Sequence, residues 1–461
     1  MLGAQIVSRS PYRAIGVALA VLAINLLAKE SATAQNGGVA LFPTNQVGGV
    51  MVDAEGVVNH VALDDLGRLG AARRRAMQSL DDDLARPAEL RKISLRRLMQ
   101  AIRENQHKAT PLSDEMLLLA GLQQVRYVFV FPQEKDIVLA GPGEGWKVDE
   151  LGEVVGITTG RPVMQLDDLL VVWRATVSMR EEISCSIDPT SDGVLRLREF
   201  VKTAGPVGPR VQATLASIEQ TLGPQTITVT GVPPSSHFAG VMVAADYRMK
   251  RLAMNFEPAP VEGMPSYLHL VSANGRGMSN MMPRWWLAPD YEPILRDPAG
   301  LAWELRGAGV KVMTEEDFVT ATGARQASGQ ASLAARKWAD SMTAHYDELA
   351  VRLPVFGQLQ ALVDLAVVAA LIHKEDLAAK AGCDLSLLTS ATELPTRDVH
   401  APRQVASVAS FIKRGRNYII SASGGVRIPS WSMVEGAQES AQPEAARQAA
   451  TSTQPNHWWW N

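Results

Sequence analysis

Cysteine is scarce in this sequence, because Cys185 and Cys383 are the only two among 461 residues. A framework of several disulfides and a cysteine-rich zinc site are therefore excluded. Two interpretations of the pair stay open. The two residues form one long-range disulfide, as an exported chain with an even cysteine count allows, or they stay reduced and buried, which suits Cys185 in the apolar run of residues 183–187.

The local motifs of common enzyme classes are also absent. The sequence has no G-x-S-x-G elbow, no H-E-x-x-H pair and no C-x-x-C pair, and its glycine-rich segments lack the Lys-Ser/Thr of a phosphate loop. No catalytic residue and no cofactor-binding residue follows from these patterns. We therefore expect a non-catalytic protein without an organic cofactor.

Positive charge is too sparse for a protein that binds nucleic acid. The formal net charge is −3, and two basic runs, residues 73–75 and 91–97, are separated by the acidic residues 81–83. A protein that binds phosphates needs a concentrated positive field. We therefore expect no nucleic-acid partner.

Long apolar runs occur only twice. The first, residues 14–28, follows Arg9 and Arg13 and precedes the small residues Ala32-Thr33-Ala34. This order is typical of a secretory signal peptide cleaved after Ala34, and an uncleaved membrane anchor is the alternative. We therefore expect an exported protein that is periplasmic or extracellular.

The second apolar run, residues 361–372, contains Asp364. A helix that spans a bilayer needs about 20 apolar residues, so this run is too short. A buried core helix explains it better. The mature chain is therefore expected to have no membrane span.

Strands and helices are interleaved along the remaining chain without a regular β-α-β order, which predicts the α+β class. The C-terminal half is expected to contain a long antiparallel helical pair. The predicted regions are a signal peptide (1–34), an N-terminal hairpin with helices (35–122), an α+β region (123–260), strands with the helical pair and a C-terminal hairpin (261–432), and a disordered tail (433–461).

Hydrophobic periodicity and turn residues predict the individual elements. Strands are expected as a hairpin within 49–58, at 125–131 with 136–141, through Cys185, at 226–232 and across 267–312. They are also expected within 405–428, where residues 417–428 suggest a hairpin. Helices are expected as a set of three within 63–122, the last capped by Ser113, and at 166–179, 192–203, 208–222, 238–256, 331–353 and 355–380. Pro354 separates the final two helices.

The sharpest local motif is the segment DPTSDGVLRLREF, which starts at Asp188. An EF-hand loop places oxygen ligands at positions 1 and 5 and a bidentate glutamate at position 12, which here are Asp188, Asp192 and Glu199. Arg196 at position 9 and a preceding strand-like segment disagree with this motif. A turn that caps a helix is therefore the favoured interpretation, and a calcium site is the alternative.

Aromatic residues supply a second binding hypothesis. Trp285 and Trp286 stand beside Arg284, and together they could form a flat surface for a sugar or a peptide. Strand alternation favours another interpretation, in which one tryptophan faces the core and the other the far side of the sheet. Trp458, Trp459 and Trp460 lie near the end of the predicted disordered tail. If exposed they form an adhesive tip, and the alternative is that they have no function.

Four stretches resemble a family of exported proteins from planctomycete-type bacteria that is known only as a domain of unknown function. They are ISCSIDPTSDGVLRL, AGVMVAADYRMKRLAMNFEP followed by MPSYLHLV, WELRGAGVKVMTEEDF, and PVFGQLQALVDLAVVAALI. The resemblance runs from about Gly48 to about Trp431. It implies export but no activity, carries over no functional residue, and weakens the calcium hypothesis, because the family does not keep the full ligand set.

Three functions are therefore considered. The first is a non-catalytic envelope or surface protein that binds an envelope or extracellular protein or a glycan. The second is a hydrolase of envelope glycan or peptide, which would need paired acids beside a groove near Trp285 and Trp286. The third is a calcium-stabilised binding module built on Asp188, Asp192 and Glu199.

Overall fold

The computed structural model describes residues 46–60, 80, 82–149, 152–203, 210–274, 283–320, 322–323, 325–411, 418–419, 422–451 and 457–461. The predicted signal peptide and its cleavage site after Ala34 lie outside the described residues. By its internal contacts the chain from Leu41 onward forms one compact unit.

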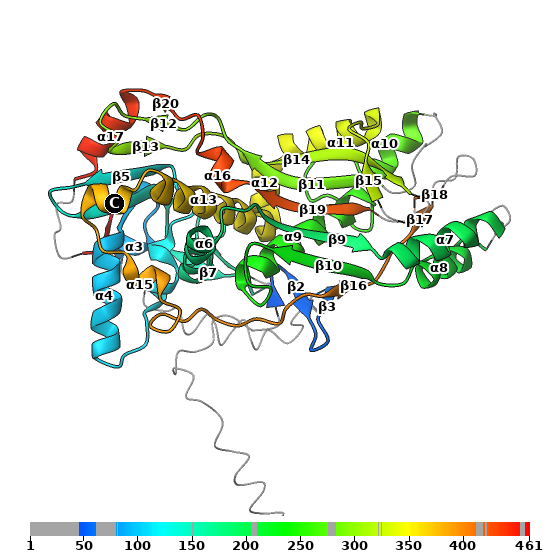
Figure 1. Cartoon of the computed structure of the whole chain (residues 1–461), viewed down its shortest axis with the longest axis horizontal. Coiled ribbons are helices and arrows are strands. Elements are labelled where there is room, and N and C mark those ends of the chain that lie inside the picture. Colours follow the sequence, from blue (N-terminus) through cyan, green and yellow to red (C-terminus); the bar gives the residue numbers. More distant parts are fainter. Residues whose placement is uncertain are drawn as a thin grey trace, which may run out of the picture. The chain divides into compact units, whose positions relative to one another are not determined.

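Sheet A, the larger of the two main sheets, contains ten strands in the described part of the chain (Figure 1). In spatial order they are β1 (Gln46–Val47), β2 (Val50–Val52), β3 (Val57–His60), β16 (Gln404–Val405), β10 (Gln225–Thr230), β9 (Ile183–Pro189), β19 (Ser423–Ile428), β11 (Pro283–Asp290), β14 (Gly309–Val319) and β15 (Arg325–Ala327). The predicted regions 35–122, 123–260 and 261–432 all contribute strands. Their boundaries therefore do not separate independent sheets.

Sheet B contains seven strands among the described residues. They are β20 (Gln438–Glu439), β12 (Leu295–Arg296), β13 (Ala302–Glu304), β5 (Tyr127–Phe131), β6 (Asp136–Gly143), β4 (Ala88–Ser94) and β21 (Trp459–Trp460). Two small ladders pair β7 (Trp146–Val148) with β8 (Val154–Gly156) and β17 (Ser410–Phe411) with β18 (Tyr418–Ile419). The predicted hairpins at β2–β3 and β5–β6 are confirmed.

The helices complete an α+β fold, as the sequence predicts. They are α3 (Asp82–Ala85), α4 (Leu95–His107), α5 (Asp114–Leu117), the 3₁₀ turn η1 (Leu119–Gly121), α6 (Leu166–Ser178), α7 (Ser191–Thr203), α8 (Val211–Leu222), α9 (His237–Ala253), α10 (Tyr267–Asn274), α11 (Leu333–Ala344), α12 (Tyr346–Arg352), α13 (Pro354–Lys374), α14 (Leu377–Ala381), α15 (Ser386–Thr389), α16 (Ser430–Met433) and α17 (Gln442–Ala449). The predicted cap at Ser113 is present, because its side chain accepts a hydrogen bond from the Met116 N–H.

Helix α13 is the central core helix. It is long and apolar enough to cross a membrane by composition alone, but its apolar stretch is fully buried inside the fold. The prediction of a buried core helix in residues 361–372 is therefore confirmed. Pro354 is the first residue of α13, where a proline needs no amide donor. The antiparallel arrangement of the helical pair stays a prediction.

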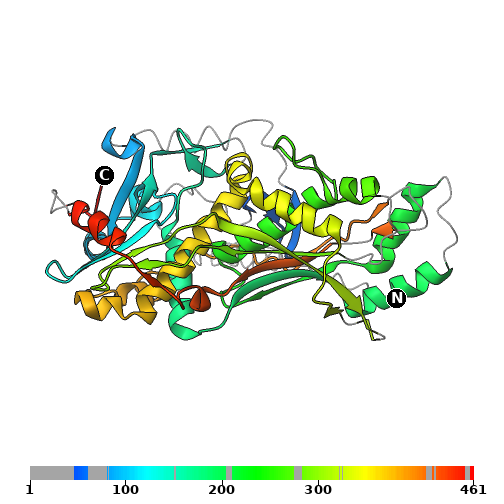
Figure 2. The same ribbon diagram turned by 90° about the horizontal axis from the view of Figure 1, so that it is seen from above.

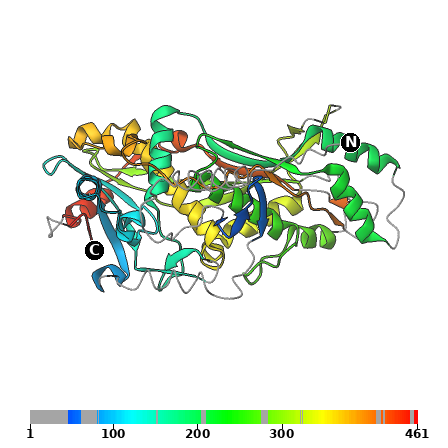
Figure 3. The ribbon, with the colours of Figure 1, turned by 90° about the horizontal axis from the view of Figure 1, so that it is seen from below.

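One face of sheet A is covered and the other is open. Helix α9 packs on β9, β19 and β11, and α11 packs on β14. The views from above and below show α11 on one side of β19 and no described helix over the other side of these middle strands (Figures 2 and 3). Antiparallel strands commonly leave one face to solvent, and the side chains then alternate between buried and exposed.

Two element predictions are wrong. Residues 88–94, expected within a helix, form the strand β4, because Arg91 is fully buried and its guanidinium donates to the carbonyl oxygens of Ala120 and Arg86. Residues 267–274, expected as a strand, form helix α10, and the Ser266 hydroxyl accepts the His269 N–H at its start. The strand depends on a partner far along the chain, whereas the helix begins at a local cap that the apolar spacing of residues 267–271 does not report.

The hairpin expected at residues 417–428 is also wrong, although strands do lie within 405–428. β17 and β18 form a short antiparallel ladder there. The longer strand β19 does not pair with them, because it lies in sheet A between β9 and β11.

The prediction of a disordered tail is wrong for the described residues of 433–461. Strand β21 pairs with β4 at the edge of sheet B, and Trp458, Trp459 and Trp460 are buried. The Trp459 indole N–H donates to Glu115, and the Arg91 guanidinium lies 5.2 Å from the Trp459 ring. Three large aromatic side chains supply enough apolar area to hold a segment whose composition is otherwise polar.

Candidate functional site

Strand β11 separates its two neighbouring tryptophans onto opposite faces of sheet A. Trp285 is 0% exposed and its ring meets the rings of Tyr267 and Trp338 edge-on, each at a centroid distance of 4.9 Å. Trp286 is partly exposed on the open face. The alternation predicted for this pair is confirmed, so only Trp286 is available to a ligand.

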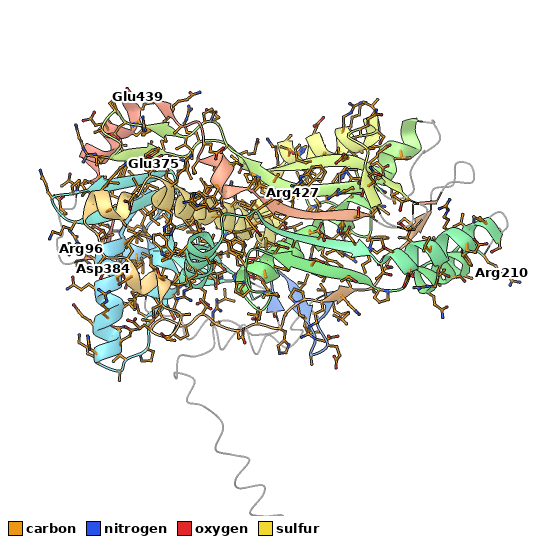
Figure 4. The ribbon with its side chains drawn as sticks, viewed as in Figure 1. Arg96, Arg210, Glu375, Asp384, Arg427 and Glu439 are labelled. Atoms are coloured by element: carbon orange, nitrogen blue, oxygen red, sulfur yellow. The ribbon has the colours of Figure 1, made fainter. Side chains whose placement is uncertain are left out.

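Trp286 lies between two other strands of sheet A. Across the strands it pairs with Met313 on β14 and with Gly425 on β19. Gly425 has no side chain, and a Cβ at this position would lie 1.7 Å from the Cys185 carbonyl oxygen of β9. Arg427, two residues further along β19, is exposed on the same face and forms an ion pair with Glu182 (Figure 4).

A groove of about 470 Å³ opens beside Trp286. This volume lies in the range of small-molecule sites. Its lining residues come from β11, β14 and the segment that leads from β15 into α11: Trp286, Thr314, Glu315, Gly329, Gln330, Ala331 and Arg336. The groove therefore combines one aromatic ring with a carboxylate, an amide, a hydroxyl and a guanidinium.

Hydrogen bonds and charges fix the walls of this groove. Glu315 Oε1 accepts the Gly329 N–H at 2.6 Å, which holds the segment after β15 against β14. The Arg284 guanidinium lies 5.5 Å from the Trp286 ring and 3.5 Å from Asp317. Arg336 is exposed at the start of α11. The lining thus carries one negative and one positive side chain, so its formal charges balance.

The groove does not supply the two acids that a glycosidase requires. Glu315 is the single carboxylate among the lining residues that the structure describes. Acid–base hydrolysis of a glycosidic bond uses two carboxyl groups about 5 to 9.5 Å apart. The polar side chains of Thr314, Gln330 and Arg336 in the lining can donate or accept hydrogen bonds to a bound molecule.

The three residues of the calcium hypothesis do not converge. Asp188 is on β9, whereas Asp192 and Glu199 are on α7, seven positions apart and therefore separated by about 10 Å along the helix axis. Glu199 forms an ion pair with Lys202. In an EF-hand the ligands lie in a loop, but here the helix already starts at Ser191.

The turn caps a helix, which is the interpretation that the sequence favoured. The Thr190 hydroxyl accepts the Gly193 N–H at 3.0 Å. Within the described ranges, no group of three His, Cys, Asp or Glu side chains has the geometry to hold a metal ion.

The two cysteines are free and buried. Cys185 lies on β9 in sheet A, and Cys383 follows α14, where its sulfur accepts a hydrogen bond from the Ile137 amide of sheet B. Burial raises the thiol pKa of both residues, to about 11 for Cys383. The disulfide alternative is therefore not formed: Cys185 lies on a strand of sheet A, Cys383 lies in the loop after α14, and both are free, buried thiols.

A second convergence of polar groups, the His237 cluster, was not predicted. It comprises Glu153, Gln165, Asp168, His237 and Arg397. His237 Nδ1 lies 3.0 Å from both carboxylate oxygens of Asp168, and its Nε2 lies 3.5 Å from Gln165 Nε2. No sequence pattern joins these residues, because Asp168 and His237 are at the starts of two helices, 69 positions apart.

The His237 cluster has the parts of an acid–base site but little room. Glu153 accepts the Gly49 N–H and the Gln358 amide, and burial raises the pKa of its carboxyl group. The Arg397 guanidinium bonds to Asp167 and Gln165. The cavity volume is about 20 Å³, enough for one water molecule. This network therefore ties together separate chain segments and has no space for a substrate.

Comparison with known proteins identifies one family. Residues 185–267 match the family described as "Protein of unknown function (DUF1598)". No curated protein and no solved structure matches the chain. The matched segment runs from β9 to the first residue of α10, whereas the sequence resemblance was expected from Gly48 to Trp431. A family of unknown function is therefore confirmed for this segment.

Proposed function

We propose that this chain is an exported, non-catalytic protein that binds an uncharged glycan of the cell envelope in the groove beside Trp286. The observation that carries this proposal is the groove itself, with a partly exposed indole among groups that donate and accept hydrogen bonds. A sugar ring offers an apolar face of C–H groups and a rim of hydroxyls, so it can use both.

The distribution of exposed apolar side chains favours a glycan over a protein partner. Protein interfaces have a contiguous apolar centre with aromatic anchors. The large hydrophobic residues that are exposed in the described chain are spread over β14, α11, α12 and the ends of β8 and α6: Ile157, Val177, Met179, Met313, Leu333 and Val351. Of these, only Met313 pairs with Trp286 across the strands.

The balanced charges of the groove favour an uncharged ligand. Glu315 and Arg336 contribute opposite charges, and Arg284 is compensated by Asp317. An acidic glycan would place its carboxylates near Glu315, which costs free energy when the carboxylates approach within a few ångströms. Because Glu315 has no second acid beside it in the lining, the glycan is held and not cleaved.

Binding is tested by isothermal titration calorimetry with a panel of uncharged and uronic-acid oligosaccharides. We expect saturable binding of an uncharged member, and Trp286→Ala weakens it at least about tenfold, equivalent to about 1.4 kcal/mol. Trp431→Ala is the matched control, because Trp431 is another partly exposed tryptophan, with Arg180 4.7 Å from its ring. Equal affinity of the wild type and Trp286→Ala, or product fragments after incubation, would overturn the proposal.

Export is tested separately by expression of the full chain in a Gram-negative host. The order of residues 9–34 supports a signal peptide, so we expect a secreted or periplasmic product that begins at Gln35. Deletion of residues 1–34 leaves the product in the cytoplasm. An uncleaved product in the cytoplasm from the full chain would contradict export without affecting the groove.

A further inference from the structure

A small cavity lies between α9 and the strands of sheet A, away from the groove. Its volume is about 40 Å³, which is room for about three water molecules. Seven of its eleven lining residues fall within residues 185–267, the segment that matches the family of unknown function. The cavity is therefore mostly a product of that segment.

Most of the cavity wall is apolar, and Gln225, Tyr247, Lys250 and Arg251 add polar groups to it. Aliphatic and aromatic side chains form most of it: Ile187, Met254, Phe256, Val405, Val408 and Ala422. The Lys250 side chain lines the cavity although this residue is only 8% exposed. A buried ammonium group in this wall favours an occupant that accepts a hydrogen bond, because an unpaired polar group in a mostly apolar site is costly.

Lys250 has one donor that its neighbours do not use. Its Nζ donates to Asp246 Oδ2 at 2.8 Å and to the Ile187 carbonyl oxygen at 3.0 Å. An ammonium group carries three N–H donors, so these two contacts among the described residues leave one. That donor is the polar group that Lys250 offers to an occupant of the cavity.

A gain in stability does not explain why Lys250 and Asp246 form a buried ion pair. Asp246 is 0% exposed, and its Oδ1 has no hydrogen-bond partner among the described residues. Burial raises the pKa of the Asp246 carboxyl group to about 6, although Lys250 opposes this shift. Buried ion pairs are commonly no more stabilising than apolar residues of the same size, and an incompletely bonded pair is worse.

We propose that this cavity binds a short aliphatic group that ends in a carbonyl or carboxylate oxygen, such as a short acyl chain. The apolar wall holds the methylene groups, and the unused Lys250 N–H donates to the oxygen. The group of the occupant that meets Lys250 must accept a hydrogen bond, because an ammonium group only donates and Asp246 itself does not line the cavity. The volume limits the chain to a few carbon atoms.

Thermal denaturation of the full mature chain with small probes tests this site. Butyrate and butyramide share the acceptor oxygen and differ in charge, and butylammonium has the same chain without an acceptor. We expect a saturable rise in Tm with butyrate or butyramide, because a ligand that binds only the folded state stabilises it. The stronger of the two identifies the preferred head group. An equal rise with butylammonium, or no rise with any probe, would overturn the proposal.

Two variants separate the site from general effects on folding. Lys250→Met combined with Asp246→Asn removes both charges and should abolish the rise in Tm. Ala406→Leu places a larger side chain at an exposed lining position and should block entry while Lys250 is unchanged. A rise in Tm that persists in the double variant contradicts the proposal. If the double variant does not fold, Ala406→Leu provides the test, and a rise in Tm that persists in this variant contradicts the proposal. Trp286→Ala should show the same rise in Tm as the wild type. A failure of this proposal can therefore be distinguished from a failure of the proposed glycan binding in the groove.

Discussion

The two faces of sheet A use the same strands for different purposes. On the covered face, Trp285 and Leu287 are packed under helices and are 0% exposed. On the open face, Trp286 and Met313 pair across β11 and β14 and stay accessible. Consecutive residues thus differ completely in environment, because side chains alternate along a strand. One face provides stability, and the other is the face on which we propose that a ligand binds.

The two adjacent tryptophans have different environments. Trp285 has lost its contact with water and gained ring contacts with Tyr267 and Trp338. Trp286 keeps part of its surface in solvent beside a polar groove. A substitution at one position should therefore change the free energy of unfolding, and at the other the affinity for a ligand.

The largest expected effect is on the covered face. Trp285→Ala should lower the free energy of unfolding by about 3 to 5 kcal/mol, because it removes a buried ring and leaves a cavity. Trp286→Ala, the control on the open face, should cost less than about 1 kcal/mol. Urea denaturation followed by circular dichroism measures both. Equal losses in the free energy of unfolding for the two variants would contradict the difference between the two faces.

A smaller loss is expected at the edge of sheet B. Trp459→Ala should lower the free energy of unfolding by about 2 to 3 kcal/mol, because it removes a nearly buried ring and its contacts with Arg91 and Glu115. Thermal denaturation and protease sensitivity near the C-terminus measure the loss. An unchanged Tm with an unchanged digestion pattern would mean that the tail does not dock in solution.

The buried carboxyl group of Asp246 should make stability depend on pH. Its folded pKa of about 6 exceeds the ordinary value of 3.8, so the folded state binds the proton more tightly than the unfolded state. This contribution is fully present below pH 3.8 and is lost as pH rises through 6, by up to about 3 kcal/mol. In Asp246→Asn this part of the pH profile should disappear. Parallel profiles for the wild type and the variant would contradict the assignment.

The smallest effect is expected at the helix-capping turn before α7. Asp192→Asn and Glu199→Gln should each change the free energy of unfolding by less than about 0.5 kcal/mol, because both side chains are exposed. Millimolar calcium should leave the Tm of the wild type unchanged. A rise in Tm with calcium that Glu199→Gln abolishes would restore the calcium hypothesis.

The sequence predicted the fold well where local signals decide it. Alternating apolar residues predicted β5, β6 and β11, and helical periodicity predicted α6, α9 and α13. The wrong predictions for β4 and for the C-terminal tail have long-range causes. Strand β4 has a polar sequence because Arg91 bonds to backbone oxygens and to Asn461, which is 370 positions away.

The prediction of a disordered tail was wrong for a related reason. Its composition predicts disorder, but Trp459 pairs with Ile93 of β4, a partner that no local pattern identifies. Within the candidate site, Trp286 was predictable from its place in a strand. Glu315, Gln330 and Arg336 were not, because the chain must fold around β15 before they share a groove.

The most direct test of the account uses the indole N–H signals of the ten tryptophans in one NMR spectrum. Trp286→Phe and Trp285→Phe identify their two signals by loss. Titration with the bound uncharged oligosaccharide should shift the Trp286 signal in proportion to saturation and leave the Trp285 signal unchanged. A Trp286 signal that does not move while another tryptophan responds would contradict the assignment of the groove as the binding site.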